Sequence, residues 1–250
     1  MEDPFVLAIF FFMIAVFYSS VGFGGGSSYL ALLILANVDL FTMRSTALMC
    51  NIIVVASGTV IFYQQGYLNI KRSLPIVLCS VPLAFLGGYL PLSSGVIFIT
   101  LGFALLIAAI LLWVKPHVHS ADKSTYPTAF GAGLGGGIGF LSGMVGIGGG
   151  IFLSPFLNLL NWSSPKKIAA IASFFILVNS IAGLLGQWLQ HPPYVDFHWS
   201  WPLLLAVFMG GQIGSRIATQ NFSNSTIKRT TAVLVLIASL KILNDHLFEF

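Results

Sequence analysis

Long apolar runs, separated by short polar or glycine-rich breaks, make up most of the chain. A bilayer-spanning helix needs about 20 mainly apolar residues, so runs of this kind indicate membrane helices. The predicted segments are roughly 5–20, 27–42, 45–65, 73–91 and 95–114, then 126–142, 150–162, 166–189, 199–220 and 227–244. The pattern predicts an all-α polytopic membrane protein.

A polar stretch near the middle of the chain divides these segments into two sets. Residues 115–127, KPHVHSADKSTYP, form the most polar stretch of the sequence. We therefore predict a first transmembrane repeat over 1–114, a cytoplasmic linker over 115–127 and a second transmembrane repeat over 128–250. Each repeat is expected to hold a glycine-tipped helical hairpin followed by three transmembrane helices.

The two halves carry matching glycine clusters. VGFGGG at 21–26 matches VGIGGG at 145–150, and AFLGGYL at 84–90 matches GQIGSRI at 211–217, with Gly87 over Gly214. Internal repeats of this size in a membrane chain are typical of transporters. The alternative is that small residues recur only because membrane helices pack through them.

The basic residues favour one topology. If each glycine cluster is the tip of a hairpin that returns to its own side, nearly all basic residues share one face, as the positive-inside rule requires. That face carries Lys71, Arg72, Lys115, Lys123, Lys166, Lys167, Arg216, Lys228 and Arg229, and the other carries Arg44 and Lys241. Each half then crosses the membrane an odd number of times, so the second half is inverted. Both termini are predicted to be extracytoplasmic.

Composition narrows the class of protein. The chain is 57% hydrophobic and 7% charged, whereas soluble domains carry about 25% charged residues. The net charge of +4 reflects loops that are rich in lysine and arginine, as in membrane proteins. No nucleic-acid partner is therefore expected. Cys50 and Cys79 lie in apolar segments, which predicts buried thiols and no disulfide.

The glycine clusters suggest a binding site. Non-helical backbone at membrane depth survives only inside protein or beside a water-filled cavity, so the two tips should meet near the midplane. Glycine permits positive φ and close approach of a ligand. Each tip begins a helix, at about Ser27 and Ile151, and helix N-termini attract anions. A turn that serves packing alone is the alternative; a phosphate-binding P-loop is excluded because its lysine is missing.

Polar residues within the following helices are candidates to line the same site. Intramembrane polar groups are functional candidates by default, although a structural interhelical hydrogen bond explains each one equally well. The predicted substrate-binding residues are Gly24, Gly25, Gly26, Ser27, Asn51, Gly148, Gly149, Gly150, Ser173, Asn179 and Ser180. No cofactor or metal is expected, because all five histidines fall at predicted helix ends or in loops.

Three further polar residues lie nearer the segment ends. Arg216 could meet a substrate anion on the cytoplasmic side, but snorkelling to the interface is favoured. Arg44 is predicted to be an interface anchor, and Gln187 is a weak pore candidate. No acidic residue is expected at mid-membrane, which argues against a carboxylate-coupled pump.

These motifs resemble a known family. GFGGGSSYLALLIL and GMVGIGGGIFLSPFL resemble the paired glycine motifs of the TauE/SafE family of sulfite and organosulfonate exporters. Similarity extends to Thr46-Ala47 with Asn51 and to AAIASFFILVNSIAG at 169–183. It also includes the glycines at 87–88 and 210–211, with Gly214. The resemblance implies a cell-membrane exporter of a small anion, with sulfite or an organosulfonate as the expected substrate. Together with the two inverted halves, we expect it to work by alternating access around a midplane site.

Other functions stay open at this stage. A channel or uniporter for other small organic anions and a non-transporting membrane assembly factor are alternatives, and oligomerisation is undecided. An intramembrane enzyme is disfavoured, because the serine of GFLSG at 139–143 has no histidine or lysine base predicted at its depth.

Overall fold

The computed structural model describes residues 4–91, 93–113, 128–160, 162–190, 197–217, 233, 235–237, 239, 240 and 242–245. The helices are α1 (Pro4–Ser19), α2 (Gly26–Leu35), α3 (Leu40–Gln64), α4 (Ile70–Tyr89), α5 (Ser94–Trp113), α6 (Thr128–Val145), α7 (Gly150–Leu159), α8 (Pro165–Gln190) and α9 (Phe197–Ile217). The predicted all-α class is confirmed for this part of the chain. The predicted linker 115–127, much of segment 227–244 and both chain ends lie outside the described residues.

One predicted helix boundary is wrong. The second and third segments were expected to divide between residues 42 and 45, but α2 ends at Leu35 and α3 begins at Leu40. The side chain of Asp39 accepts a hydrogen bond of 2.9 Å from the backbone nitrogen of Thr42. Aspartate is a favoured N-cap, and this cap starts α3 earlier than the apolar pattern indicated.

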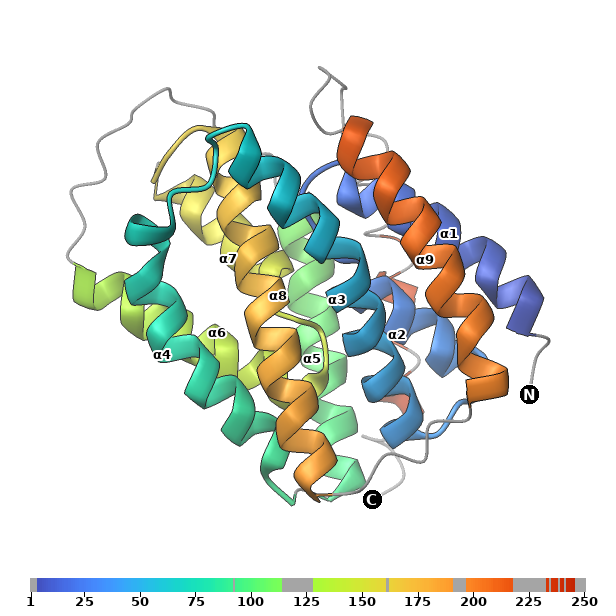
Figure 1. The fold of residues 1–250 in the computed structure, drawn as a ribbon. Helices are drawn as coiled ribbons and strands as arrows, with labels where there is room; N and C mark the ends of the chain where they lie inside the picture. The colour runs from blue at the N-terminus through green and yellow to red at the C-terminus, as the bar shows by residue number, and fades with distance from the viewer. Residues whose placement is uncertain are drawn as a thin grey trace.

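Helices α3 and α8 form the centre of the bundle and run antiparallel (Figure 1). The Nε2 atom of Gln187, near the end of α8, donates to the carbonyl oxygen of Phe41 at the start of α3, at 3.2 Å. Helices α1 and α9 pack together on one side of this pair, and α4 and α6 on the other. Elements from the two halves of the sequence are therefore interleaved.

Glycines allow these helices to approach closely. A Cβ built on Gly214 of α9 would overlap the carbonyl oxygen of Val16 in α1, and one on Gly143 of α6 would overlap that of Ala84 in α4. Small residues at such crossings are typical of helix packing in membranes, where close van der Waals contact drives association.

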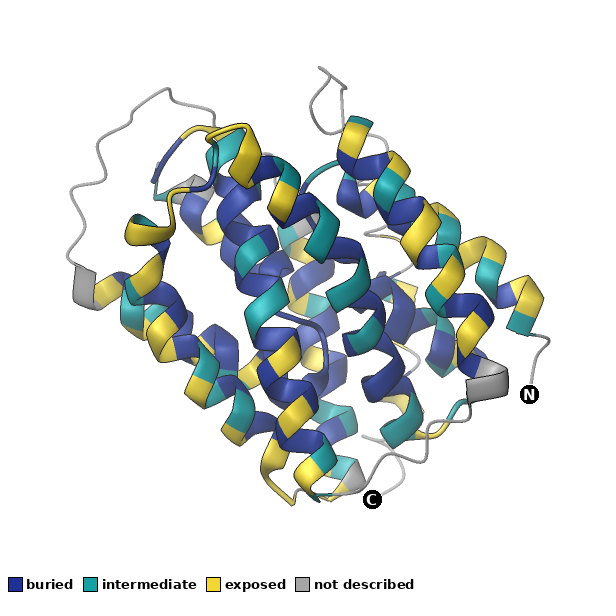
Figure 2. Cartoon of the chain, viewed as in Figure 1, coloured by how far each residue is buried: buried dark blue, intermediate teal, exposed yellow. Residues whose placement is uncertain are grey.

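The outer surface of the bundle is apolar. Exposed residues lie on the outward faces of α1, α4 and α9 (Figure 2), and they include Phe10, Leu78 and Phe208. Helices α3, α4 and α8 are each long and apolar enough to cross a bilayer. Cys50 is buried as predicted, but Cys79 is exposed; it belongs to this apolar surface of α4, so that prediction is wrong.

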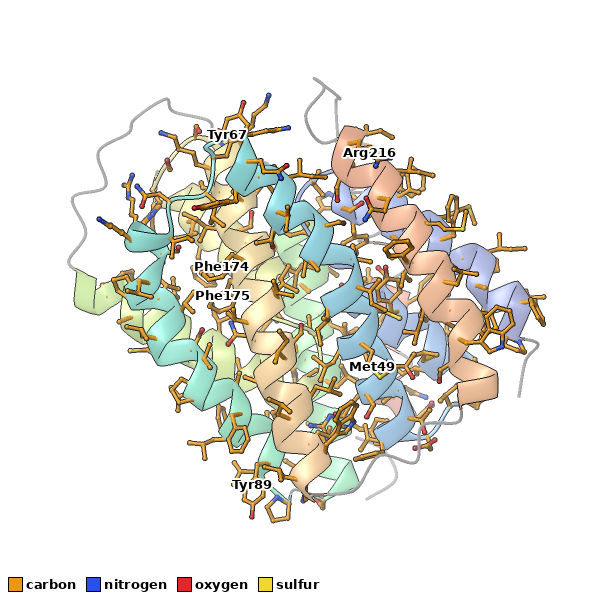
Figure 3. All side chains as sticks on the ribbon, in the orientation of Figure 1. Met49, Tyr67, Tyr89, Phe174, Phe175 and Arg216 are labelled. Carbon is orange, nitrogen blue, oxygen red and sulfur yellow. The ribbon has the colours of Figure 1, made fainter. Side chains whose placement is uncertain are left out.

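Basic side chains from both halves gather at one end of the bundle. Tyr67 and Arg216 lie at this end and Tyr89 at the other (Figure 3). The Lys166 ammonium stands 5.6 Å from the ring centre of Tyr67. The Arg72 guanidinium lies 5.4 Å from the ring centre of Trp162.

Candidate functional site at the contact of two glycine-rich breaks

Two breaks interrupt the helical hairpins, residues 20–25 between α1 and α2 and residues 146–149 between α6 and α7. Side chains other than glycine's disfavour the left-handed backbone region. Positive φ angles occur in both breaks, at Gly22 (80°), Gly25 (95°), Gly146 (87°), Gly148 (84°) and Gly149 (80°). The glycines are therefore required by the backbone path itself.

The two breaks meet at Asn51 of α3. Its side chain is fully buried, and Nδ2 donates to the carbonyl oxygen of Ile147 at 2.9 Å. A Cβ on Gly24 would overlap Asn51 Oδ1, and one on Gly26 would lie 2.6 Å from the Ile147 oxygen. Asn51 thus sits between the first break and the second, with no space left for side chains.

Helix α8 also contacts both breaks. A Cβ on Gly148 would lie 2.7 Å from Asn51 Nδ2 and 2.9 Å from Ser180 Oγ. Ser173 Oγ donates to the carbonyl oxygen of Gly22 at 2.8 Å. The predicted residues Gly24, Gly26, Asn51, Gly148 and Ser180 are therefore brought together, with Ser173 holding the first break.

Other predicted site residues lie around this contact. A Cβ on Gly25 would meet Ile14 and Tyr29 of its own hairpin, and one on Gly149 would meet Phe175, Ile138 and Ser142. Gly150 packs against Ile176. These glycines shape the two turns and do not face Asn51.

Two predicted polar residues also differ in their setting. Asn179 is buried, and its Nδ2 donates at 2.8 Å to the carbonyl oxygen of Phe175 on its own helix. Ser27 is buried in the first turn of α2. The Asn179 bond is local to α8, so no contact with either break is assigned to this side chain.

Two buried polar atoms at the contact, Asn51 Oδ1 and Ser180 Oγ, have no hydrogen-bond partner. Asn179 Oδ1, elsewhere on α8, is also without one. A buried polar group without a partner costs about 1–3 kcal/mol, and such groups in a folded protein call for an explanation such as a ligand or ordered water. Asn51 was expected to donate to a bound anion, but in this conformation its donor is engaged by Ile147.

Arg44 is the functional candidate that sequence reasoning missed. It was predicted to anchor at the membrane interface, but its side chain is only 5% exposed, which overturns that prediction. Nη2 donates to the carbonyl oxygen of Gly143 at 3.3 Å, and a Cβ on Gly146 would lie 3.2 Å from Arg44 Cβ. The available signal was its position seven residues before Asn51, on the same face of α3.

Arg44 also has an unusual charge environment. Among the described residues with buried side chains, it is the one that carries a formal charge. Within the same part of the chain, no group of three or more His, Cys, Asp or Glu gathers to hold a metal. The one formal charge buried among these residues is therefore positive.

A groove between α3 and α9 reaches toward the basic end of the bundle. Its volume is about 650 Å³, and Gln64, Gln212 and Arg216 supply most of its polar lining, with Ser57. A groove of about 670 Å³ between α4 and α8 is lined by apolar residues, including Phe85 and Val178. Arg216 therefore lines the more polar of these two grooves.

Comparison with known proteins identifies the family. The model of the family described as "Sulfite exporter TauE/SafE" matches residues 7–242. The chain is 34% identical over 244 residues to "Probable membrane transporter protein y4hK" of Sinorhizobium fredii, covering 95% of this chain and 97% of that protein.

Two more distant relatives have the same kind of name. Identity is 27% to "Probable membrane transporter protein ORF9" of Sinorhizobium sp, covering 98% and 96% of the two chains. It is 22% to "Probable membrane transporter protein YunE" of Bacillus subtilis, covering 92% and 94%. No solved structure matches. The chain therefore belongs to the sulfite exporter TauE/SafE family of membrane transporters.

Proposed function

We propose that the protein exports a small oxyanion, sulfite or an organosulfonate, through a site at the contact of the two glycine-rich breaks. The observation that carries the proposal is the buried bond from Asn51 of α3 to Ile147 of the second break, because the same Asn51 side chain also lies against Gly24 of the first break. Backbone polar groups and small side chains converge there beside unpartnered atoms of Asn51 and Ser180. The family membership supports transport as the activity.

An anion is the ligand that this site suits. Helices α2 and α7 begin at Gly26 and Gly150, beside the contact. A helix N-terminus carries roughly half a unit of positive charge and free N–H groups. Arg44 adds a full positive charge beside the second break. An oxyanion offers several acceptor oxygens to these donors, which a halide does not.

We propose that the two halves are inverted repeats. Under this proposal α1 to α5 correspond to α6 to α9 and the helical residues after 233. Two observations support it. The pairing of α1 with α9 has its counterpart in the pairing of α6 with α4. Gly25 packs on Ile14 and Gly149 on Ile138, and each isoleucine precedes its glycine by the same number of residues.

Two bonds that join the halves support alternating access as the proposed mechanism. Asn51 of the first half holds the second break, and Ser173 of the second half holds the first. In transporters built from repeats, one half rocks against the other around a fixed site. We propose that both bonds are made in the conformation described here and are released when the protein opens to the other side of the membrane.

The gathering of basic residues suggests the orientation. The end that carries Arg72 and Lys166 is proposed to face the cytoplasm, by the positive-inside rule. With re-entrant hairpins, both termini are then extracytoplasmic, and residues 115–127 connect the repeats on the cytoplasmic side.

A flux assay in proteoliposomes tests the proposed function. Purified protein should give saturable flux of sulfite or methanesulfonate and none of methylammonium. Empty liposomes and protein with Gly148→Ala serve as controls, because this substitution fills the space between Asn51 and Ser180. Flux of the amine without flux of either oxyanion would contradict the proposal.

A further inference from the structure

Small or polar residues recur at seven-residue spacing on the facing sides of α3 and α8. They are Arg44, Asn51 and Gly58 on α3, and Ser173, Ser180 and Gln187 on α8. Seven residues return a helix to nearly the same face. Because the two helices are antiparallel, the residues fall into three levels, which we call the polar seam. At 1.5 Å per residue the seam is about 21 Å long, most of a hydrocarbon core of about 30 Å.

Contacts in the structure establish the levels of the polar seam. At one end, a Cβ on Gly58 would lie 3.6 Å from Ser173 Oγ and 3.3 Å from Ser215 Oγ. In the middle, Asn51 and Ser180 both approach Gly148. At the other end, Gln187 bonds to the backbone of Phe41, one helical turn before Arg44.

The end of the polar seam at Arg44 holds unsatisfied groups. Arg44 Nε is buried without a partner, and so is Gln187 Oε1. No described carboxylate forms an ion pair with Arg44, whose one bond is to the Gly143 carbonyl. A buried charge without a counter-charge is strongly unfavourable, and a bound anion would remove this cost.

A structural role accounts for part of the Arg44 environment. Gly143 lies in the last turn of α6, where a positive charge is favoured by the helix dipole. That role uses one of the five N–H donors of the guanidinium. The remaining donors, including Nε, form the planar fork that binds oxyanions with two parallel hydrogen bonds.

We propose that Arg44 is the cationic residue of a second oxyanion-binding station, lined by Gln187, at the end of the polar seam away from Ser173. This inference rests on the proposed function and adds a station beyond the contact of the two breaks. An oxyanion would pass from the middle level to Arg44 before it leaves the protein. The ligand class is a small sulfur oxyanion with at least two free oxygens.

Binding measurements on the purified full-length protein test this station. Thermal stabilisation is measured against sulfite and methanesulfonate, with chloride holding the ionic strength constant, because a ligand that binds the folded state raises its stability. Arg44→Gln should raise the apparent dissociation constant about tenfold or more, as expected for loss of a charge-assisted bidentate contact. The matched control is Arg72→Gln, which removes a guanidinium that also donates to a carbonyl, Trp162 at 2.9 Å, but away from the polar seam.

Each outcome has a defined meaning. Wild-type affinity in Arg44→Gln would overturn the station while leaving the proposed function intact. If that variant does not fold, Arg44→Lys decides, because lysine keeps the positive charge but lacks the planar fork; unchanged oxyanion affinity there also overturns the station. Absence of oxyanion-specific stabilisation in the wild type would contradict the proposed function itself.

Discussion

At the scale of single residues, the site depends on glycines whose neighbours leave no room for a side chain. Gly148 combines a positive φ of 84° with contacts to Asn51 and Ser180. Gly66 has a similar φ of 72° but lies in a turn with nothing within 4 Å of a built Cβ. Comparing substitutions at the two positions separates the effect of backbone strain from the effect of filling the proposed site.

Gly148→Ala should therefore abolish transport, whereas Gly66→Ala should preserve it. Both substitutions pay the left-handed backbone penalty of about 1–2 kcal/mol. The check is sulfite flux per inserted protein in proteoliposomes. Equal flux in the two variants would show that the space at Gly148 has no role in transport.

Asn51 gives a second prediction, about charge. Asn51→Asp removes the donor to Ile147 and places a carboxylate beside both that carbonyl and the proposed anion. Asn51→Ala leaves the buried Ile147 carbonyl without its donor, at a cost of about 1–3 kcal/mol, but adds no charge. We expect Asp to lose transport and Ala to retain part of it. The comparison is made on flux normalised to membrane-inserted protein; a fully active Asp variant would argue against an anion at this position.

At the scale of the elements, the sequence pattern was informative where one residue type decides the outcome. The glycine clusters predicted both breaks, and the structure starts α2 and α7 within one residue of the expected positions. The start of α3 was missed, because the apolar run continues across residues 40–42 and hides the cap at Asp39. The pattern of apolar residues indicates which positions are buried, whereas the start of a helix can depend on a single capping side chain.

The contact of Asn51 with both breaks could not be predicted from the sequence pattern. Asn51 and Ile147 lie 96 positions apart, so their contact depends on the tertiary arrangement that brings α3 to the second break. The same holds for Arg44, whose place near the start of a helix suggested an interface anchor. Its burial comes with contacts to Gly143 in the last turn of α6 and to Gly146 of the second break, which lie about 100 positions away in the chain and which no local pattern encodes.

Helix α6 provides a test of close packing at this scale. A Cβ on Gly139 would lie 2.5 Å from the carbonyl oxygen of Ser80, whereas a Cβ on Gly137 meets nothing within 4 Å. Gly139→Ala should lower the thermal unfolding temperature in detergent, since overpacking costs about 1–3 kcal/mol. Gly137→Ala should leave it unchanged or raise it, because alanine favours the helix. A larger loss at Gly137 would contradict the α4–α6 crossing.

At the scale of the whole molecule, the two interleaved halves place Arg72, Lys166 and Arg216 at one end and enclose the candidate site between them. The proposed orientation predicts which positions a membrane-impermeant thiol reagent reaches in intact cells. In a background without Cys50 and Cys79, Ser93→Cys should be labelled from outside and Lys71→Cys only after permeabilisation. Labelling of both from the same side would rule out re-entrant hairpins with this orientation.

The central claim is that an oxyanion crosses the membrane by alternating access at the contact of the two breaks. Counterflow tests it most directly: proteoliposomes preloaded with unlabelled sulfite are diluted into a trace of radiolabelled sulfite. A carrier with one alternating site predicts transient accumulation of label above equilibrium, and loss of that accumulation in Gly148→Ala. Simple equilibration without an overshoot, or an overshoot that survives in Gly148→Ala, would contradict the account.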